Sequence, residues 1–173
     1  MTRDRDPAGR PRNARPRDAL GRPLPRTEAN AGQTMIPDDL ALTGPEAARL
    51  ADRLLREGRP FHAHEVFEAS WKSGPPDERD LWQGLAQIAV GLTHAHRGNA
   101  RGAVTLLGRG TQRVRAYLDR AEPSPEGERG HPYGMDLAAF VATCEDLAAR
   151  IEREGLAAIP AAALRPELIV PGP

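Results

Sequence analysis

The chain of 173 residues has little cysteine, few aromatic side chains and no excess charge of either sign. Its single cysteine, Cys144, excludes an internal disulfide and a CxxC metal site, and it favours a reducing compartment, so we expect a cytoplasmic protein. The 24 basic residues balance 24 acidic ones, and nucleic acid is therefore not an expected partner. No apolar run approaches the roughly 18 residues that a membrane span needs, and the first residues lack the apolar core of a secretory signal.

The two ends of the chain differ from its middle in composition. Residues 1–35 hold eight arginines and five prolines but almost no large apolar side chains. Such a segment cannot bury enough surface to offset the entropy of ordering it, so we predict a disordered arm, with Met35 as a candidate start of the protein. Acidic residues between the arginines and the lack of aromatics argue against a nucleic-acid-binding arm. We expect residues 159–173, with four prolines, to form an irregular tail, which leaves residues 36–158 as the folded domain.

Between these ends the sequence has the pattern of helices. Apolar residues recur at helical spacing, and no segment shows the alternation typical of a strand. Thr43 with Glu46 has the form of a capping box, and Asn99 and Asp136 are good N-cap residues for two later helices. The connections are short enough to join antiparallel neighbours. The sequence therefore predicts an all-α fold, a compact antiparallel bundle of about five helices.

The third predicted helix is unusual because residues 81–95 contain no Asp, Glu, Lys or Arg. A helix without charge is normally buried on all sides. One stripe is apolar, and the opposite stripe holds Gln83, Gln87, Val90 and His94. We expect this polar stripe to face protein, either another helix or a second subunit, so that a homo-oligomer stays open.

The second predicted helix offers partners for that stripe. His64 and Glu68 are one turn apart, and Trp71 follows on the same face. We therefore expect His64, Glu68, Gln87 and His94 to converge between the two helices. The full candidate ligand-binding cluster is His64, Glu65, Glu68, Trp71, Gln83, Gln87 and His94.

These residues form two blocks that resemble a known family. The blocks are Phe61-His62-Ala63-His64-Glu65-Val66-Phe67-Glu68 with Trp71, and Gln83-Gly84-Leu85 with Gln87, His94, Gly98-Asn99 and Gly102-Ala103. Together they are similar to the signature of the bacterial and archaeal family called domain of unknown function 309, over about residues 45–120. The resemblance implies a compact helical domain in which the two helices pack together. It implies no activity, because none is assigned to the family.

Two classes of function stay open, so the sequence does not decide whether the protein is an enzyme. In the first class the protein is a binding or interaction module with a buried His/Glu/Gln polar cluster. In the second it is a metal-dependent, hydrolytic enzyme in which His64, Glu68 and His94 hold a divalent metal with a water in the fourth place. The string His64-Glu65-x-x-Glu68 differs from the zinc-protease pattern HExxH by the glutamate at its end. A metal-free acid/base pair of His64 and Glu68 is weakened because no Ser or Cys nucleophile shares their face.

Overall fold

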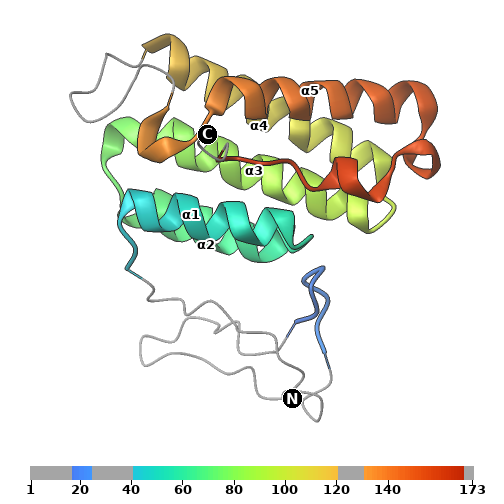
Figure 1. The fold of residues 1–173 in the computed structure, drawn as a ribbon, viewed down its shortest axis with the longest axis horizontal. Coiled ribbons are helices and arrows are strands. Elements are labelled where there is room, and N and C mark those ends of the chain that lie inside the picture. The colour runs from blue at the N-terminus through green and yellow to red at the C-terminus, as the bar shows by residue number, and fades with distance from the viewer. Residues whose placement is uncertain (1–16, 25–40, 121–130, 170–173) are drawn as a thin grey trace.

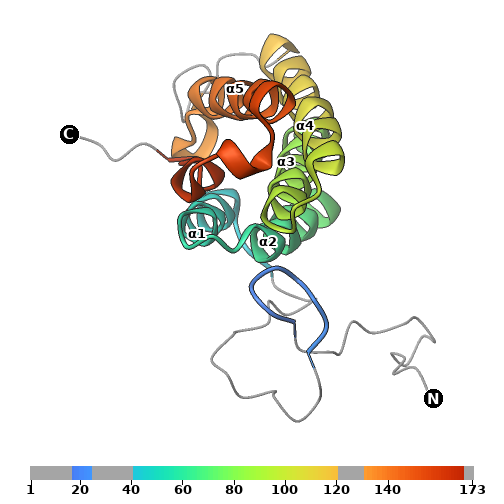
Figure 2. The same ribbon diagram turned by 90° about the vertical axis from the view of Figure 1, so that its right-hand side faces the viewer.

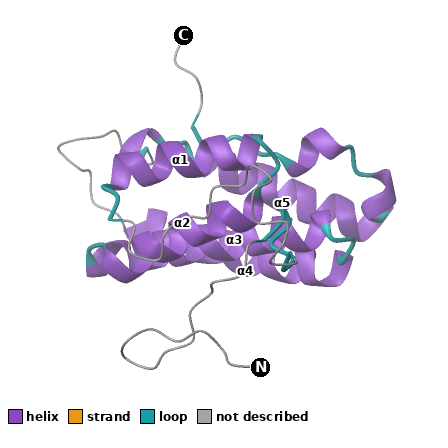
Figure 3. Ribbon diagram, turned by 90° about the horizontal axis from the view of Figure 1, so that it is seen from below, coloured by secondary structure: helices purple, strands orange, loops and turns teal. Residues whose placement is uncertain are grey.

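The computed structural model describes residues 17–24, 41–120 and 131–169 (Figure 1). Within them the regular structure is helical, with no strand, and the predicted all-α bundle of five helices is confirmed (Figure 3). The α-helices are α1 (Gly44–Arg56), α2 (Pro60–Ser73), α3 (Arg79–His96), α4 (Ala100–Arg120) and α5 (Leu137–Glu154). The short 3₁₀ helices are η2 (Pro76–Glu78), η3 (Pro132–Gly134), η4 (Leu156–Ala158) and η5 (Ala161–Leu164).

Helices that follow one another in the chain also pack against one another. Seen end-on, α1 to α5 form an arc around a shared core, and the segment after α5 runs back between α5 and α1 (Figure 2). None of the helices in the described ranges is both long enough and apolar enough to cross a membrane.

The predicted helix starts are confirmed by their hydrogen bonds. The backbone N–H of Thr43 donates to the Glu46 carboxylate over 2.9 Å at the start of α1. The side-chain oxygen of Asn99 accepts from the backbone N–H of Gly102 over 2.9 Å, and that of Asp136 accepts from the next turn of α5 over 3.0 Å. These local contacts satisfy N–H groups that a helix leaves unbonded in its first turn.

Helix α3, whose residues 81–95 carry no Asp, Glu, Lys or Arg, lies at the centre of the bundle. All its residues from Leu81 to His96 are buried or half-buried, as its composition predicts. Its contact with α4 is especially close, because a Cβ placed on Gly110 would lie 2.7 Å from the carbonyl oxygen of Gly84. The polar stripe is only half-buried: Gln83, Gln87 and Val90 line a pocket, and His94 lies outside it.

The folded body extends past the predicted boundary at residue 158, to residue 169. Ile159 and Leu168 are buried, and the carboxylate of Asp52 in α1 accepts from the backbone N–H groups of Leu168 and Ile169 over 2.8 and 3.0 Å. The carbonyl of Leu168 accepts in turn from Asp136. Part of the predicted tail is therefore fixed between α1 and α5, because a buried carboxylate satisfies its backbone donors.

A short N-terminal segment also contacts the body. Residues 17–24 form a tight turn in which the Arg17 guanidinium lies 5.3 Å from the centre of the Phe61 ring, and Arg97 donates to the carbonyl of Leu20. Within the arm that we predict to be disordered, this segment has contacts with the body that need no large apolar side chains, namely a cation–π contact and a hydrogen bond to a backbone carbonyl. Residues 1–16 and 25–35 lie outside the described residues.

Candidate functional site

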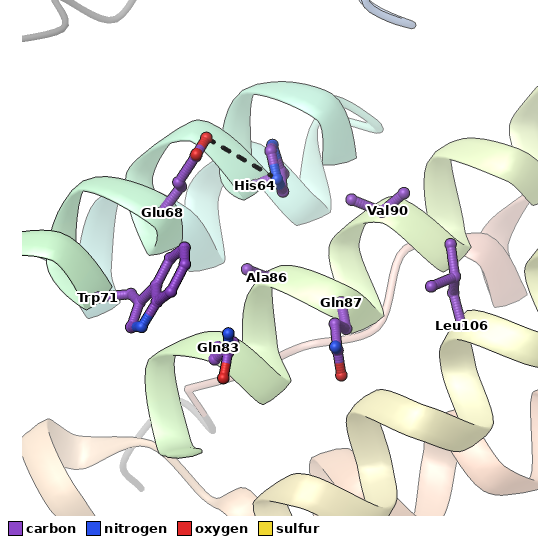
Figure 4. A pocket seen from close by; sticks show the side chains of 8 residues that line it. All are labelled: His64, Glu68, Trp71, Gln83, Ala86, Gln87, Val90 and Leu106. Carbon is purple, nitrogen blue, oxygen red and sulfur yellow. Dashed lines mark ion pairs between the residues drawn. The ribbon is translucent and has the colours of Figure 1, made fainter. Parts of the chain in front are cut away.

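A pocket of about 210 Å³ opens where α2, α3 and α4 meet. It is lined by His64, Glu68, Trp71, Gln83, Ala86, Gln87, Val90 and Leu106 (Figure 4). Five of the seven residues in the predicted cluster are among them. The predicted convergence of His64, Glu68 and Gln87 between the two helices is therefore present.

Helix geometry explains how these side chains come together. In Figure 4, α2 and α3 run in opposite directions, so that Trp71 lies near Gln83 and His64 lies near Val90. Residues three or four apart share one face of a helix, and each helix supplies such a series to the pocket. The third wall is Leu106 of α4.

Glu68 is shared between two basic side chains. One oxygen, Oε1, lies 2.8 Å from Nζ of Lys72, whereas Oε2 lies 4.0 Å from Nε2 of His64. The second distance is too long for a hydrogen bond. The side chains of His64 and Glu68 are 25% and 37% exposed, so the pair is reachable from the pocket mouth.

His64 has the properties of a neutral imidazole. Burial lowers its pKa below the ordinary value of 6.5; the charge of Glu68 acts in the opposite direction, and that of Lys72 adds to the lowering. With one proton on the ring, the nitrogen nearer Glu68 (Nε2) is the better place for it, which leaves Nδ1 as an acceptor. Nδ1 is buried and has no hydrogen-bond partner in the described parts of the chain.

The two glutamines of α3 differ in whether their side-chain oxygen has a hydrogen-bond partner. Oε1 of Gln83 accepts from Arg113, which also pairs with Asp80 over 3.1 Å. Oε1 of Gln87 is buried and has no hydrogen-bond partner among the residues described here. Two residues that line the pocket therefore carry buried polar atoms without partners, Nδ1 of His64 and Oε1 of Gln87.

Two residues of the predicted cluster do not line the pocket. Glu65 is half-buried on α2 outside it. His94 lies in the last turn of α3. Its Nδ1 is 3.0 Å from the side-chain amide nitrogen of Asn99, the residue that caps α4. His94 is seven residue steps beyond Gln87, a distance of about 10 Å along the helix.

The predicted metal ligands His64, Glu68 and His94 do not line one pocket, since His94 is not among its lining residues. Across residues 17–24, 41–120 and 131–169, no three side chains of His, Cys, Asp or Glu are grouped so that they could hold a metal ion. This corrects the hypothesis of a three-ligand metal centre at this place.

Leu106 is a pocket residue that the sequence reasoning missed, because that reasoning compared only the second and third helices. Leu107, its neighbour, points into the core, and Leu106 lies half-buried beside it. Two adjacent leucines on a helix widen its apolar face. This sequence feature could have indicated that the fourth helix also lines the pocket.

The fold and the pocket define a helical bundle with a polar cluster carried by two neighbouring helices. A family model described as "Domain of unknown function (DUF309)" matches residues 49–106, a range that contains every residue lining the pocket. The predicted resemblance to this family is therefore confirmed over residues 49–106.

A curated relative agrees with this assignment. The "Uncharacterized protein YpuF" of Bacillus subtilis (strain 168) is 44% identical over 48 residues. The match covers 27% of this chain and 28% of that protein, so the chain matches little more than a quarter of the relative's length. No solved structure matches the chain.

Proposed function

We propose that this domain is a binding module whose pocket between α2, α3 and α4 takes a small organic molecule with N–H or O–H donors. The observation that carries the proposal is the pair of buried atoms without partners, Nδ1 of His64 and Oε1 of Gln87, which belong to two residues lining one pocket. Both atoms are acceptors in the neutral state argued above. A ligand that donates to them completes the cluster.

Energetics supports a ligand over a purely structural cluster. Each unsatisfied buried polar group costs about 1–3 kcal/mol, and folded proteins rarely keep such groups without a use. By contrast, Gln83, one turn before Gln87, has its oxygen satisfied by Arg113. Among the residues that line the pocket, His64 and Gln87 therefore carry the buried atoms without partners.

The size and lining of the pocket set the kind of ligand. Its volume of about 210 Å³ is below the roughly 300–1,000 Å³ typical for drug-sized ligands, which favours a small molecule. Trp71, Ala86, Val90 and Leu106 supply apolar walls for a flat body. The lining holds no hydroxyl or thiol nucleophile, which favours reversible binding over covalent catalysis.

Benzamide is a suitable probe, since it is flat, neutral and carries an NH₂ donor. In NMR titrations of the full chain, we expect the indole N–H signal of Trp71 to shift saturably, with a dissociation constant of about 1 mM, as befits a fragment. The indole of Trp82, which donates to Glu78 over 2.8 Å in the core, is the internal reference. N,N-dimethylbenzamide, which has no donor, should bind at least several-fold more weakly.

Matched variants locate the binding. Gln87→Leu removes a pocket acceptor, whereas Gln112→Leu makes the same change on an exposed face of α4. We expect the first variant to lose benzamide binding and the second to keep it. If the Trp71 signal does not respond to benzamide, or if both variants respond alike, the proposal is wrong.

A further inference from the structure

We infer that the ligand is a planar cation whose N–H groups share the charge, such as an amidinium or guanidinium group on a small flat body. This inference rests on the binding function proposed above and adds the charge of the ligand. It follows from which polar atoms line the pocket and which of them are already occupied.

Three acceptors on two helices belong to residues that line the pocket. From α2 come Nδ1 of His64 and the carboxylate of Glu68, and from α3 comes Oε1 of Gln87. The eight lining residues include no lysine or arginine. A ligand that meets three acceptors must bring several donors, and N–H groups on one plane bring them in a fixed fork.

The carboxylate of Glu68 supplies the charge preference. Lys72 contacts only Oε1, over 2.8 Å, while Oε2 faces His64 beyond hydrogen-bond distance. Oε2 can therefore accept from a ligand without displacing Lys72. Hydrogen bonds between charged partners are about twice as strong as neutral ones, so a cation gains more at this position than a neutral amide.

The aromatic wall points to the same ligand class. Trp71 lines the pocket from the helix that carries Glu68, three residues further along. The face of an indole ring attracts a cation and also packs against a flat apolar body. His64 adds no competing charge while its imidazole is neutral.

The test compares benzamidinium with benzamide, which have nearly the same shape and differ in charge. Titrations of the full chain, followed by the Trp71 indole signal, should give benzamidinium an affinity about tenfold higher than that of benzamide. Benzoate, an anion of similar shape, should not bind.

Two variants of α2 and one control make the test specific. Glu68→Gln should bring the affinity ratio of the two probes close to one. Lys72→Met, which removes a like charge and frees Oε1, should tighten benzamidinium binding several-fold and leave benzamide unchanged. Glu152→Gln, the same change at an exposed position of α5, should leave the ratio as it is.

The outcomes separate the two proposals. If neither benzamide nor benzamidinium binds, the binding function itself is wrong, and this inference fails with it. If benzamide binds as well as benzamidinium, or if benzoate binds best, the pocket remains a binding site and the cation inference is overturned. If Glu68→Gln leaves the ratio of the benzamidinium and benzamide affinities unchanged, the inference is also overturned, because the carboxylate would then not cause the preference for a cation. The gain expected from Lys72→Met keeps the test decisive even if Glu68→Gln folds poorly.

Discussion

The central helix α3 has two very different neighbours. Against α4 it packs backbone to backbone, and a Cβ on Gly84 would lie 2.7 Å from a methyl group of Val114. On its α2 side it borders a pocket whose lining includes polar side chains, two of which hold buried atoms without partners. The face of α3 toward α4 is closely packed, which we call the closed face. The face toward α2 borders the pocket and carries a buried oxygen without a hydrogen-bond partner, and we call it the open face.

This difference separates the part of the bundle that supports the fold from the part that carries the candidate site. Close helix packing is rigid, because interiors are as dense as crystals and tolerate little change in volume. An open face beside such a support can hold polar groups in fixed positions for a ligand. Substitutions on the two faces of α3 should therefore have opposite consequences for stability and binding.

The largest expected effect is on the closed face. Gly110→Ala places a Cβ 2.6 Å from Cγ1 of Ile88 and 2.7 Å from the carbonyl oxygen of Gly84, so α3 and α4 must move apart. We expect a loss of about 3 kcal/mol or more in the free energy of unfolding, measured by urea denaturation.

A second glycine of α4 is the matched control for this substitution. Nothing lies within 4 Å of a Cβ placed on Gly108, which is exposed on the same helix. Gly108→Ala should raise stability by up to about 1 kcal/mol through helix propensity. Equal effects of the two substitutions would show that the α3–α4 contact is not as close as described.

The second prediction concerns His62, which lies on a different side of α2 from His64. His62 is 3% exposed, and burial, aided by the charge of Arg59, lowers its pKa to about 4 against the opposing charge of Asp18. Since the unfolded chain takes up a proton near pH 6.5 and the folded chain only near pH 4, stability should fall as the pH falls through this window, by at most about 3 kcal/mol from this residue.

Urea denaturation between pH 7 and 4 measures this dependence. We expect His62→Leu to flatten it, whereas His131→Leu, at an exposed position before η3, should not change it. The slopes of the wild type and the His62→Leu variant should differ; identical slopes would contradict the buried, neutral state of His62.

The smallest expected effects distinguish the two glutamines of α3. Gln83→Leu removes the acceptor of Arg113 and should cost about 1 kcal/mol. Gln87→Leu removes an oxygen that has no partner in the described part of the protein, so stability should stay the same or rise slightly. Thermal unfolding of both variants measures the difference, and a large loss for Gln87→Leu would mean that its oxygen is satisfied after all.

Local signals in the sequence were sufficient to predict most of the bundle. Asn99 and Asp136 each accept from an N–H of their own first turn, and Glu46 accepts from Thr43, so the effect of these residues does not depend on the rest of the fold. The spacing of His64, Glu68 and Trp71 likewise placed them on one face before any neighbour was known. The α2 wall of the site therefore followed from helix geometry alone.

Long-range contacts were not predictable in the same way. The spacing that placed His94 on the stripe of Gln87 is correct, but it cannot show that Asn99 holds the imidazole at the far end of the helix. The contacts of Asp52 with residues 168 and 169 join positions more than 110 apart in the chain. Periodicity describes one helix at a time, and these contacts depend on how several elements meet.

The most direct test of the open face is the state of the His64 ring nitrogens, read by ¹⁵N NMR of the full chain. The account predicts that Nδ1 carries no proton near neutral pH and that its signal moves when benzamidinium is added, as expected for an acceptor gaining a donor. Gln112→Leu should leave this response intact. A protonated Nδ1, or an Nδ1 signal that ignores the probe, would contradict the claim that α2 and α3 present unsatisfied acceptors to a ligand.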